Sequence, residues 1–391
     1  MPAPRARVSP RAGRLIQQQT GPDGYAAFIP APLPPEPPID FNVLHVELER
    51  AAAALARLDG LSRGVHPDTL LYAYVRKEAV LSSQIEGTQS TLADLLQYES
   101  AEAPGAPLGD VREVSHYVQA LQHGVARLRG GMPMSLRLIR EVHAELLRDG
   151  RGAHQAPGEF RRSQNWIGGT RPGAAHFVPP PPHEVMPALG ALERFLHEGA
   201  FAPVVKAGLA HAQFESIHPF LDGNGRVGRL LITLLFVADG VLSEPFLYLS
   251  LYFKRHRSAY YDALQAVRTH GDWEGWLRFY LEGVHATATE AIATTTALLA
   301  LFAADRERVR GLGRAAPSAL RVYEHLQQRV IISAPRTAEA LELALPTVGS
   351  ALARLEQLGI VREITGRQWG RQYAYAEQLR LLAPDDDTPP A

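Results

Sequence analysis

Residues 218–229 read HPFLDGNGRVGR, and this stretch decides how the rest of the chain is interpreted. It holds one histidine, one aspartate, one asparagine, three glycines and two arginines, and the apolar run LLITLLFVA follows directly. A plain turn needs neither a histidine nor two arginines, and a helix interior disfavours glycine. The stretch therefore predicts a ligand-binding loop that leads into an apolar helix.

Two familiar glycine-rich loops fit this stretch poorly. Gly223, Gly225 and Gly228 match the spacing G-x-G-x-x-G of a dinucleotide-binding loop, but that loop follows a strand, and the preceding AGLAHAQFESIHP indicates a polar helix. A Walker A loop is excluded because no Lys-Ser or Lys-Thr pair follows the glycines.

The remaining hypothesis is an anion cradle at the start of a helix. The N–H groups of a Gly-Asn-Gly loop approach a ligand closely, and the helix dipole favours negative charge there. Arg226 and Arg229 are three residues apart and share a face of the first turn. Asp222 is suited to Mg²⁺ beside phosphates, and His218 to general-base work. Each residue alone also fits an ordinary turn, but together they predict a di- or triphosphate site.

The full pattern resembles the signature of the Fic family, H-P-F-x-[D/E]-G-N-G-R-x-x-R, at every specified position. The segments PGEFRRSQNWIGG (157–169) and FVPPPP (177–182) resemble the family's flap, and residues 248–284 resemble its C-terminal helices. The likeness extends from about residue 35 to 285. Fic enzymes typically transfer AMP from ATP to a hydroxyl of a protein and release pyrophosphate, so the resemblance implies a Mg²⁺-dependent protein adenylyltransferase.

The resemblance also implies roles for single residues. His218 is the expected base, Asp222 the ligand of Mg²⁺, and Arg226 and Arg229 the partners of the β- and γ-phosphates. Tyr260 and Tyr261 border the nucleoside or, as an alternative left open, pack as ordinary helix residues. The whole nucleotide-binding set implied is Asp222, Gly223, Asn224, Gly225, Arg226, Gly228, Arg229, Tyr260 and Tyr261.

Two further segments acquire a function from the resemblance. The flap residues Ile167, Gly168, Gly169 and Thr170 are expected to clamp the target's extended backbone by strand addition. SSQIEG (82–87) resembles the inhibitory motif [S/T]-x-x-x-E-[G/N] through Ser82, Glu86 and Gly87, which implies that the Glu86 carboxylate occupies Arg229 in place of the γ-phosphate. In some relatives this glutamate instead aligns water to remove AMP, and the sequence leaves both directions open.

Composition sets the broad class. The chain has 391 residues, 46% of them hydrophobic, a net charge of −1 and no cysteine, which excludes disulfides and thiolate sites and favours a reducing compartment. The longest weakly polar run, residues 291–304, is shorter than a membrane span requires. We expect a cytoplasmic protein of mainly α fold that does not enter a membrane.

The expected organisation is linear. Residues 1–40 indicate a proline-rich extended arm, and 41–105 a helical region with the inhibitory helix, which starts at a cap, Asp68. Residues 106–310 are expected to form a Fic-type helical core, with a small β-hairpin flap at 150–182. After a loop at 103–109 and a linker at 311–318, residues 318–380 outline a C-terminal winged helix-turn-helix domain of three short helices and a hairpin.

The role of this last domain is left open. Residues 318–378 carry seven arginines against six acids, which gives no strong basic footprint. The expected recognition helix, 346–358, offers Thr347, Ser350, Arg354 and Gln357, and the wing carries Arg362, Arg367 and Arg371. DNA binding, target docking and dimer contacts all fit this pattern.

The sequence thus predicts an enzyme whose substrates are ATP and a protein with a Ser, Thr or Tyr hydroxyl, with self-modification and a homodimer as further options. The alternative is a DNA-binding regulator whose Fic fold senses a nucleotide, although sensing alone needs no base at His218. A third option is a relative that transfers another phosphate-containing group.

Overall fold

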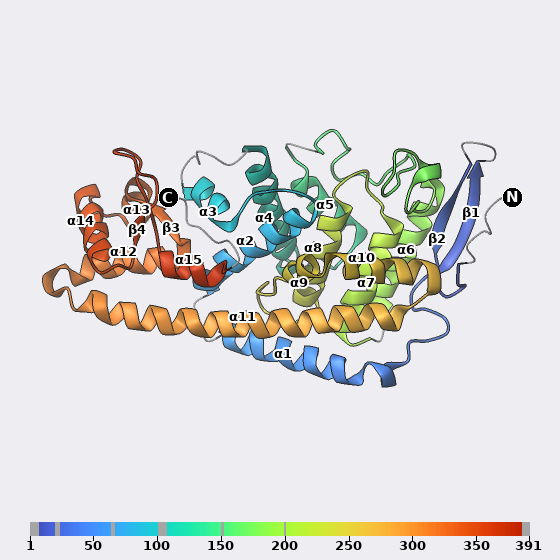
Figure 1. Ribbon diagram of the computed structural model, residues 1–391, viewed down its shortest axis with the longest axis horizontal. Coiled ribbons are helices and arrows are strands. Elements are labelled where there is room, and N and C mark those ends of the chain that lie inside the picture. The colour runs from blue at the N-terminus through green and yellow to red at the C-terminus, as the bar shows by residue number, and fades with distance from the viewer. Residues whose placement is uncertain are drawn as a thin grey trace. The chain divides into compact units, whose positions relative to one another are not determined.

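The computed structural model describes residues 8–19, 24–63, 67–100, 108–149, 152–198 and 201–384. Its elements are mainly helices, which confirms the expected fold class (Figure 1). By contacts the chain forms two compact units, residues 1–56, 116–245 and 249–288 in unit 1 and residues 57–115, 246–248 and 289–391 in unit 2. The chain passes between the units several times, so this division differs from the linear one expected from the sequence.

Unit 1 contains β1 (Gly13–Gln19), β2 (Tyr25–Pro30), η1 (Phe41–Val43), α5 (Leu136–Leu146), η2 (Pro172–Ala174), α6 (Pro182–Glu198), α7 (Pro203–Ile217), α8 (Asn224–Ala238), α9 (Ser250–Arg255) and α10 (Arg257–His270). Unit 2 contains α2 (Pro67–Ile85), α3 (Leu92–Ser100), η3 (Gly313–Ala315), α12 (Ala316–Arg329), β3 (Ile331–Ser333), α13 (Ala334–Leu341), α14 (Leu345–Gln357), β4 (Arg362–Glu363), β5 (Gln372–Ala374) and α15 (Ala376–Leu382). Residues of both units belong to α1 (His45–Arg63), α4 (Leu108–Arg129) and α11 (Trp273–Arg310).

The central helix of unit 1 is α7, which packs against α6, α8, α10 and β2. Small residues let its neighbours approach closely. A Cβ on Gly208 would lie 2.7 Å from the ring of Tyr280, and Trp276 donates a 2.8 Å hydrogen bond to the Gly208 carbonyl. Since α7 is buried on all sides, its C-terminal end is held in a fixed place, and the motif begins there.

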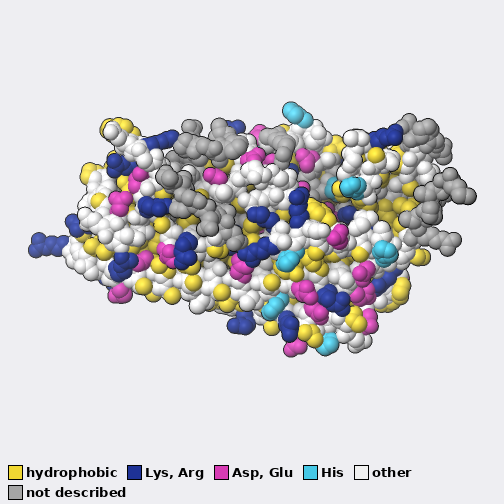
Figure 2. All heavy atoms as spheres, in the orientation of Figure 1, with side chains coloured by type: hydrophobic (Ala, Val, Ile, Leu, Met, Phe, Trp, Pro, Cys, Tyr) yellow, Lys and Arg dark blue, Asp and Glu magenta, His cyan; other side chains and the backbone are white. Residues whose placement is uncertain are grey.

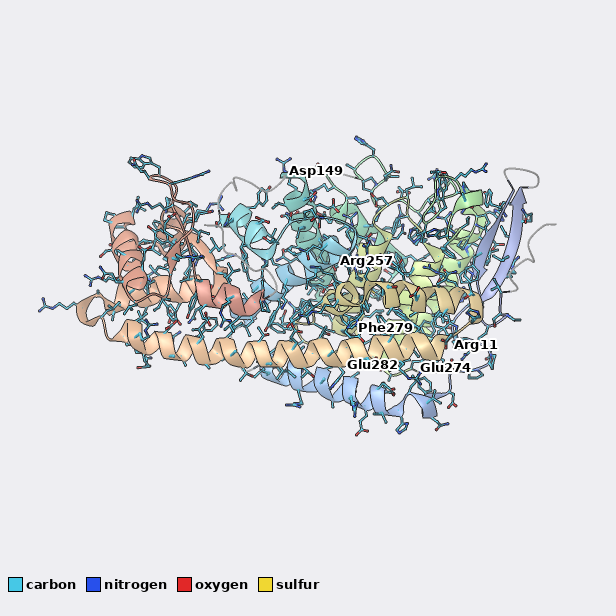
Figure 3. All side chains as sticks on the ribbon, in the orientation of Figure 1. Arg11, Asp149, Arg257, Glu274, Phe279 and Glu282 are labelled. Atoms are coloured by element: carbon cyan, nitrogen blue, oxygen red, sulfur yellow. The ribbon has the colours of Figure 1, made fainter. Side chains whose placement is uncertain are left out.

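The N-terminal segment differs from the extended arm that we predicted. Strands β1 and β2 pair antiparallel from Gly13–Pro30 to Gln19–Tyr25, and β2 buries consecutive residues, so it lacks the alternation by which a strand is predicted. Arg11 forms two hydrogen bonds, of 2.6 and 2.7 Å, with the Glu274 carboxylate at the start of α11 (Figure 3). Residues 8–19 and 24–40 are therefore an integral part of unit 1.

The C-terminal segment is likewise no separate module. Helix α12 packs on α2, and the buried Gln372 donates to the Gln97 carbonyl at 3.1 Å and to Ser100 Oγ. The three expected helices and the β-prone pair β4 and β5 are present, and β3 adds a strand, in the sheet order β3-β5-β4. The three residues of β3 are too few to give an alternating pattern. The winged-helix interpretation stays a prediction.

Several boundaries also move. Helix α2 begins at Pro67, so Asp68 lies inside its first turn and is not its cap. Most of the predicted loop at 103–109 lies outside the described residues, and the linker at 311–318 is largely taken up by η3 and α12.

Among the described residues, α11 alone is long and apolar enough to cross a membrane by length and composition, and 33% of its most apolar window is buried. A core helix has the same properties, so α11 carries no conclusion about a membrane. Figure 2 shows basic and acidic side chains interspersed over the visible face, in keeping with the near-zero net charge.

Candidate functional site

The motif forms the turn between α7 and α8. His218 caps α7 with φ 49° and ψ 61°, a left-handed conformation, and its N–H donates to the Phe214 carbonyl at 2.8 Å. Pro219 follows, and a residue before proline avoids the helical conformation, so the helix ends here. Gly223 supplies a second left-handed residue, φ 78°, directly before α8. The predicted loop that leads into an apolar helix is therefore present, and its binding of a ligand remains a prediction.

Asn224 shapes this loop from inside. Its Oδ1 accepts from the Phe220 N–H at 2.8 Å, and its Nδ2 donates to the Phe220 carbonyl at 2.9 Å. Only 2% of Asn224 is exposed. The structure therefore gives the Asn224 amide a loop-shaping role, and the phosphate contact implied by the resemblance remains a prediction.

Two residues that the sequence analysis did not single out hold the loop from the flap side. The buried Arg161 donates to the carbonyls of His218 at 2.9 Å and of Ile217 at 3.3 Å, and Asn165 Nδ2 donates to the Phe220 carbonyl at 2.8 Å. Burial lowers the pKa of the Arg161 guanidinium to about 10, so it stays charged at neutral pH. The segment FRRSQN contains both residues, but nothing in the sequence distinguishes the buried Arg161 from its exposed neighbour Arg162.

His143 supports the other side of the loop. Its ring lies parallel to that of Phe220, with centroids 3.6 Å apart. Nδ1 accepts from the Gly158 N–H at 2.8 Å, so the proton is on Nε2, which donates to the Asp222 carbonyl at 3.0 Å. Burial lowers the pKa of His143 to about 4, which keeps the ring neutral and this pair of bonds intact.

Glu215 is a further residue that the sequence analysis missed. It precedes His218 by one helical turn, and its Oε2 lies 3.8 Å from His218 Nδ1. Both side chains are largely shielded from solvent, with 8% of Glu215 and 18% of His218 exposed. At 3.8 Å the two groups are too far apart for a direct hydrogen bond, so the carboxylate acts on the imidazole through its charge. The i, i+3 spacing was the available sequence signal.

Gly228 has a packing role, and the nucleotide contact expected for it remains a prediction. A Cβ on Gly228 would lie 2.5 Å from Glu215 Oε1 and 3.3 Å from the His211 ring, so the glycine permits α7 and α8 to cross closely. The Gly228 carbonyl accepts from His211 Nδ1 at 2.8 Å. This side of α8 faces the core of unit 1.

Tyr260 and Tyr261 differ in position. Tyr260 is 1% exposed, and its hydroxyl lies 2.8 Å from His211 Nε2, which favours the alternative that it packs as an ordinary helix residue. Because Nδ1 of His211 donates to Gly228, Nε2 must accept from the tyrosine hydroxyl. Tyr261 is 42% exposed, and its nucleoside contact remains a prediction.

The charged residues of the cradle lie at the start of α8. Arg226 and Arg229 are each 2% exposed, and Arg226 approaches Asp222 Oδ1 at 3.6 Å. The Asp222 side chain is 40% exposed, and its Oδ1 also accepts from the Gly223 N–H at 2.6 Å. No three His, Asp or Glu side chains cluster as metal ligands within the described ranges. The single exposed carboxylate fits Mg²⁺, which takes its remaining ligands from phosphates and water.

The flap is a loop with one β-bridge. The Ile167 N–H donates to the Phe177 carbonyl at 2.8 Å, and the Ile167 carbonyl accepts from the N–H groups of His176 and Phe177. Gly168 and Gly169 follow with φ 70° and 71°, and a Cβ on Gly169 would lie 2.3 Å from the Ala174 carbonyl. The main-chain N–H and carbonyl of Ile167 are therefore hydrogen-bonded within the flap. If the target's extended backbone pairs with the flap as a strand, it must bond to residues next to Ile167.

The N-terminal hairpin supports this flap. The Phe28 N–H on β2 donates to the Val178 carbonyl at 2.8 Å, and Ala12, Phe28 and Phe177 form a small buried cluster. The Arg268 guanidinium lies 4.1 Å from the Phe177 ring and donates to the Glu215 carbonyl. The hairpin, the flap and the end of α7 are thereby tied together within unit 1.

The predicted inhibitory motif lies in unit 2 and ends α2. The last helical residue is Ile85, Glu86 is exposed, and Gly87 has φ 103°, which a glycine adopts readily. Ser82 is fully buried. The pairing of Glu86 with Arg229 remains a prediction.

A helical core with a glycine turn before α8 and two buried arginines on that helix is the arrangement that the motif predicts for a Fic-type fold. Residues 45–126 match the model of the Fic/DOC family N-terminal region, and residues 133–236 match that of the Fic/DOC family itself. Residues 45–126 and 133–236 are therefore similar to the two regions of the Fic/DOC family.

Solved structures agree with this fold. A Fic family protein from Desulfovibrio desulfuricans G20 matches with a TM-score of 0.56 and 19% identity over 86% of this chain and 96% of that one. Residues 134–508 of Fic-1 from C. elegans match with a TM-score of 0.52 and 21% identity over 66% of this chain and 74% of that one.

Curated relatives are similar over part of their length. The protein adenylyltransferases Fic of Drosophila ananassae and Drosophila melanogaster are each 31% identical over 238 residues, which is 57% of this chain and 44% of each relative. The chain thus spans less than half of the length of the curated relatives that it matches.

Proposed function

We propose that this protein transfers AMP from ATP to a side-chain hydroxyl of a target protein. The observation that carries the proposal is the fixed loop 218–229, which joins an oriented histidine to the N-terminus of α8 and two buried arginines. The similarity to protein adenylyltransferases of Drosophila supports the same reaction.

The reaction requires one proton acceptor and a cradle for phosphates. The target oxygen attacks the α-phosphorus of ATP, the bond from that phosphorus to the β-phosphate oxygen breaks, and pyrophosphate leaves. His218 Nδ1 faces Glu215, so we assign the proton of the attacking hydroxyl to Nε2. The Glu215 carboxylate then stabilises the imidazolium, while Arg161 and Asn165 keep the main chain of the loop in place.

In the proposed reaction, the start of α8 stabilises the negative charge of the pyrophosphate leaving group. In this proposal the N-terminus of α8 and the side chains of Arg226 and Arg229, both buried at the start of that helix, hold the β- and γ-phosphates. Mg²⁺, when bound by Asp222, neutralises phosphate charge and orients the nucleotide. Positioning and charge stabilisation supply most of the catalysis in phosphate chemistry.

Labelled ATP tests the proposal. Transfer of label from the α-position to protein, but not from the γ-position, is the expected result. The His218→Ala variant should lose transfer by about 10²–10⁴ because a general base is removed, while its ATP affinity stays near that of the parent. Label from the γ-position would mean a kinase-like reaction, and no label from either position would favour a nucleotide sensor.

We also propose that Glu86 inhibits this activity. Its carboxylate stands exposed at the end of α2, within the segment that matches the family's N-terminal model. A carboxylate that occupies Arg229 competes with the γ-phosphate for the same donors. Glu86→Gly should then raise AMP transfer, whereas Arg229→Ala should not, because the nucleotide loses the same contact.

The two variants together separate inhibition from stabilisation. A purely structural pair would make both variants less active and less stable. Glu86→Gly protein that modifies neither itself nor any lysate protein faster than the parent does would refute the inhibitory role. Release of AMP from modified protein by the parent, but not by Glu86→Gly, would assign AMP removal to the same glutamate.

A further inference from the structure

A groove of about 580 Å³ lies where the two ends of the flap meet α5 and α6. The groove is lined just before the flap by Glu159, Phe160, Arg161 and Arg162, and just after it by Pro182, His183, Val185 and Met186. The remaining lining residues come from the first turns of α5. The groove therefore belongs to the base of the flap rather than to the nucleotide cradle.

Two lining residues connect the groove to the motif. The Arg161 guanidinium holds the His218 carbonyl, and the Phe160 ring packs on Phe220 with centroids 5.1 Å apart. A ligand in the groove therefore has a fixed position relative to the catalytic loop. Such a position suits recognition of the molecule that is modified.

The charges that line the groove are mostly positive. Four arginines, at positions 137, 140, 161 and 162, face one acid, Glu159, which Arg140 already contacts at 2.5 Å. Arg137 shares Glu141 with Arg127. Arg162 is exposed and forms no hydrogen bond or ion pair with any residue that the structure describes. This imbalance favours a negatively charged occupant.

The groove also offers apolar surface. The Met186 side chain on α6 is 53% exposed, and the Phe160 ring is half-buried. A flexible thioether beside an aromatic ring accommodates side chains of varied shape. The occupant should therefore combine an acidic group with an adjacent apolar one.

We propose that this groove docks the protein substrate through an acidic residue next to an apolar one, close in sequence to the modified hydroxyl. The inference rests on the proposed AMP transfer and names the substrate feature that the site selects. Arg162 is five residues from Ile167, so an extended target held at the flap needs only about five residues to reach the groove. Arg162 pairs with the acidic group, and Met186 contacts the apolar one.

Peptide binding tests this without any reaction. The probe is a fluorescent ten-residue peptide that contains one Ser, one Thr, one Tyr and an Asp-Leu pair. It is made in two versions, with the pair before or after the hydroxyl residues. Each version has a counterpart in which Asn-Leu replaces Asp-Leu. Anisotropy with the full chain should show that one Asp-Leu arrangement binds about fivefold or more tightly than its counterpart, a difference that corresponds to one ion pair. Arg162→Glu should abolish the preference.

Arg194→Glu is the matched control. Arg194 is an exposed arginine of α6 that does not line the groove, so this variant should keep the preference. In the transfer assay Arg162→Glu should raise the KM for the Asp-Leu peptide and leave the KM for ATP unchanged. Equal binding of both peptides to the parent, or an intact preference in Arg162→Glu, would overturn the inference. Selective binding of the Asp-Leu peptide without any AMP transfer would instead refute the proposed function, while the proposal that the groove binds such a peptide would still hold.

Discussion

The Gly228→Ala variant tests whether Gly228 is needed for the packing of α7 against α8 or for binding the nucleotide. The added Cβ would lie 2.5 Å from Glu215 Oε1 and 3.3 Å from His211. His211 cannot retreat, because Gly228 and Tyr260 hold both of its ring nitrogens, so the Glu215 carboxylate has to move, and its position beside His218 changes. Overpacking of this kind costs about 1–3 kcal/mol, and the gain in helix propensity offsets about 1 kcal/mol of it.

Gly190→Ala provides the control within unit 1. Gly190 lies inside α6, and the nearest atom to its added Cβ is Arg194 Nη1 at 3.9 Å, so this variant gains helix propensity without a clash. The unfolding free energies of the two variants should therefore differ by about 1–3 kcal/mol, which is several degrees in Tm. Thermal unfolding and urea titration measure the difference.

The activity of Gly228→Ala gives a second readout. AMP transfer should fall because the position of Glu215 beside His218 changes, while the Kd for ATP stays near that of the parent. Gly228→Ala that is as stable as Gly190→Ala, or that loses ATP affinity at unchanged stability, would refute the packing role and restore a nucleotide contact for Gly228.

Three further outcomes follow from the structure. Asn224→Ala removes two buried bonds to the Phe220 main chain and should lower the unfolding free energy by about 2–4 kcal/mol in urea titration; an unchanged midpoint with lost ATP affinity would contradict the loop-shaping role. Burial lowers the pKa of His143 to about 4 and of His211 to about 3, so both histidines take up protons when the protein unfolds at mildly acidic pH. The free energy of unfolding should therefore be full above about pH 6.5 and fall by about 2 kcal/mol per histidine by about pH 5. Urea titration at both pH values checks this, and a pH dependence of the unfolding free energy that is unaltered when either histidine is replaced with Gln would contradict it. Deletion of residues 315–391 should reduce hydrogen-exchange protection in α2 and α3, because Gln372 and α12 no longer cover them, and undiminished protection would show that the C-terminal segment is an independent module after all.

The sequence was most informative where chemistry and local conformation coincide. The glycines, His218 and Pro219 each restrict their own backbone, so the loop between two helices could be predicted from local rules. Buried contacts of high sequence separation left no such signal. Neither the bond from Phe28 to Val178 nor the bond from Arg161 to His218 has a pattern that a single sequence reveals.

The contrast between local signals and contacts of high sequence separation also explains where the expectations from the sequence differ from the structure. Tyr260 and Gly228 lie beside residues of the motif in space, yet both face the core, and the helical face that each one occupies is set by the packing of α7 against α8 and α10. The prolines after β2 suggested an extended arm because β2, with its consecutive buried residues, has no alternating pattern that would have predicted a strand. The interleaving of the two units depends on packing between distant segments, which composition does not encode.

The central claim is the transfer of AMP by His218 to a protein hydroxyl. The most direct test is the intact mass of the Glu86→Gly protein after incubation with ATP and Mg²⁺, beside the double variant that also carries His218→Ala. The account predicts added AMP on the first protein and none on the second. Equal modification of both proteins, or modification of neither protein and of no lysate protein, would contradict it.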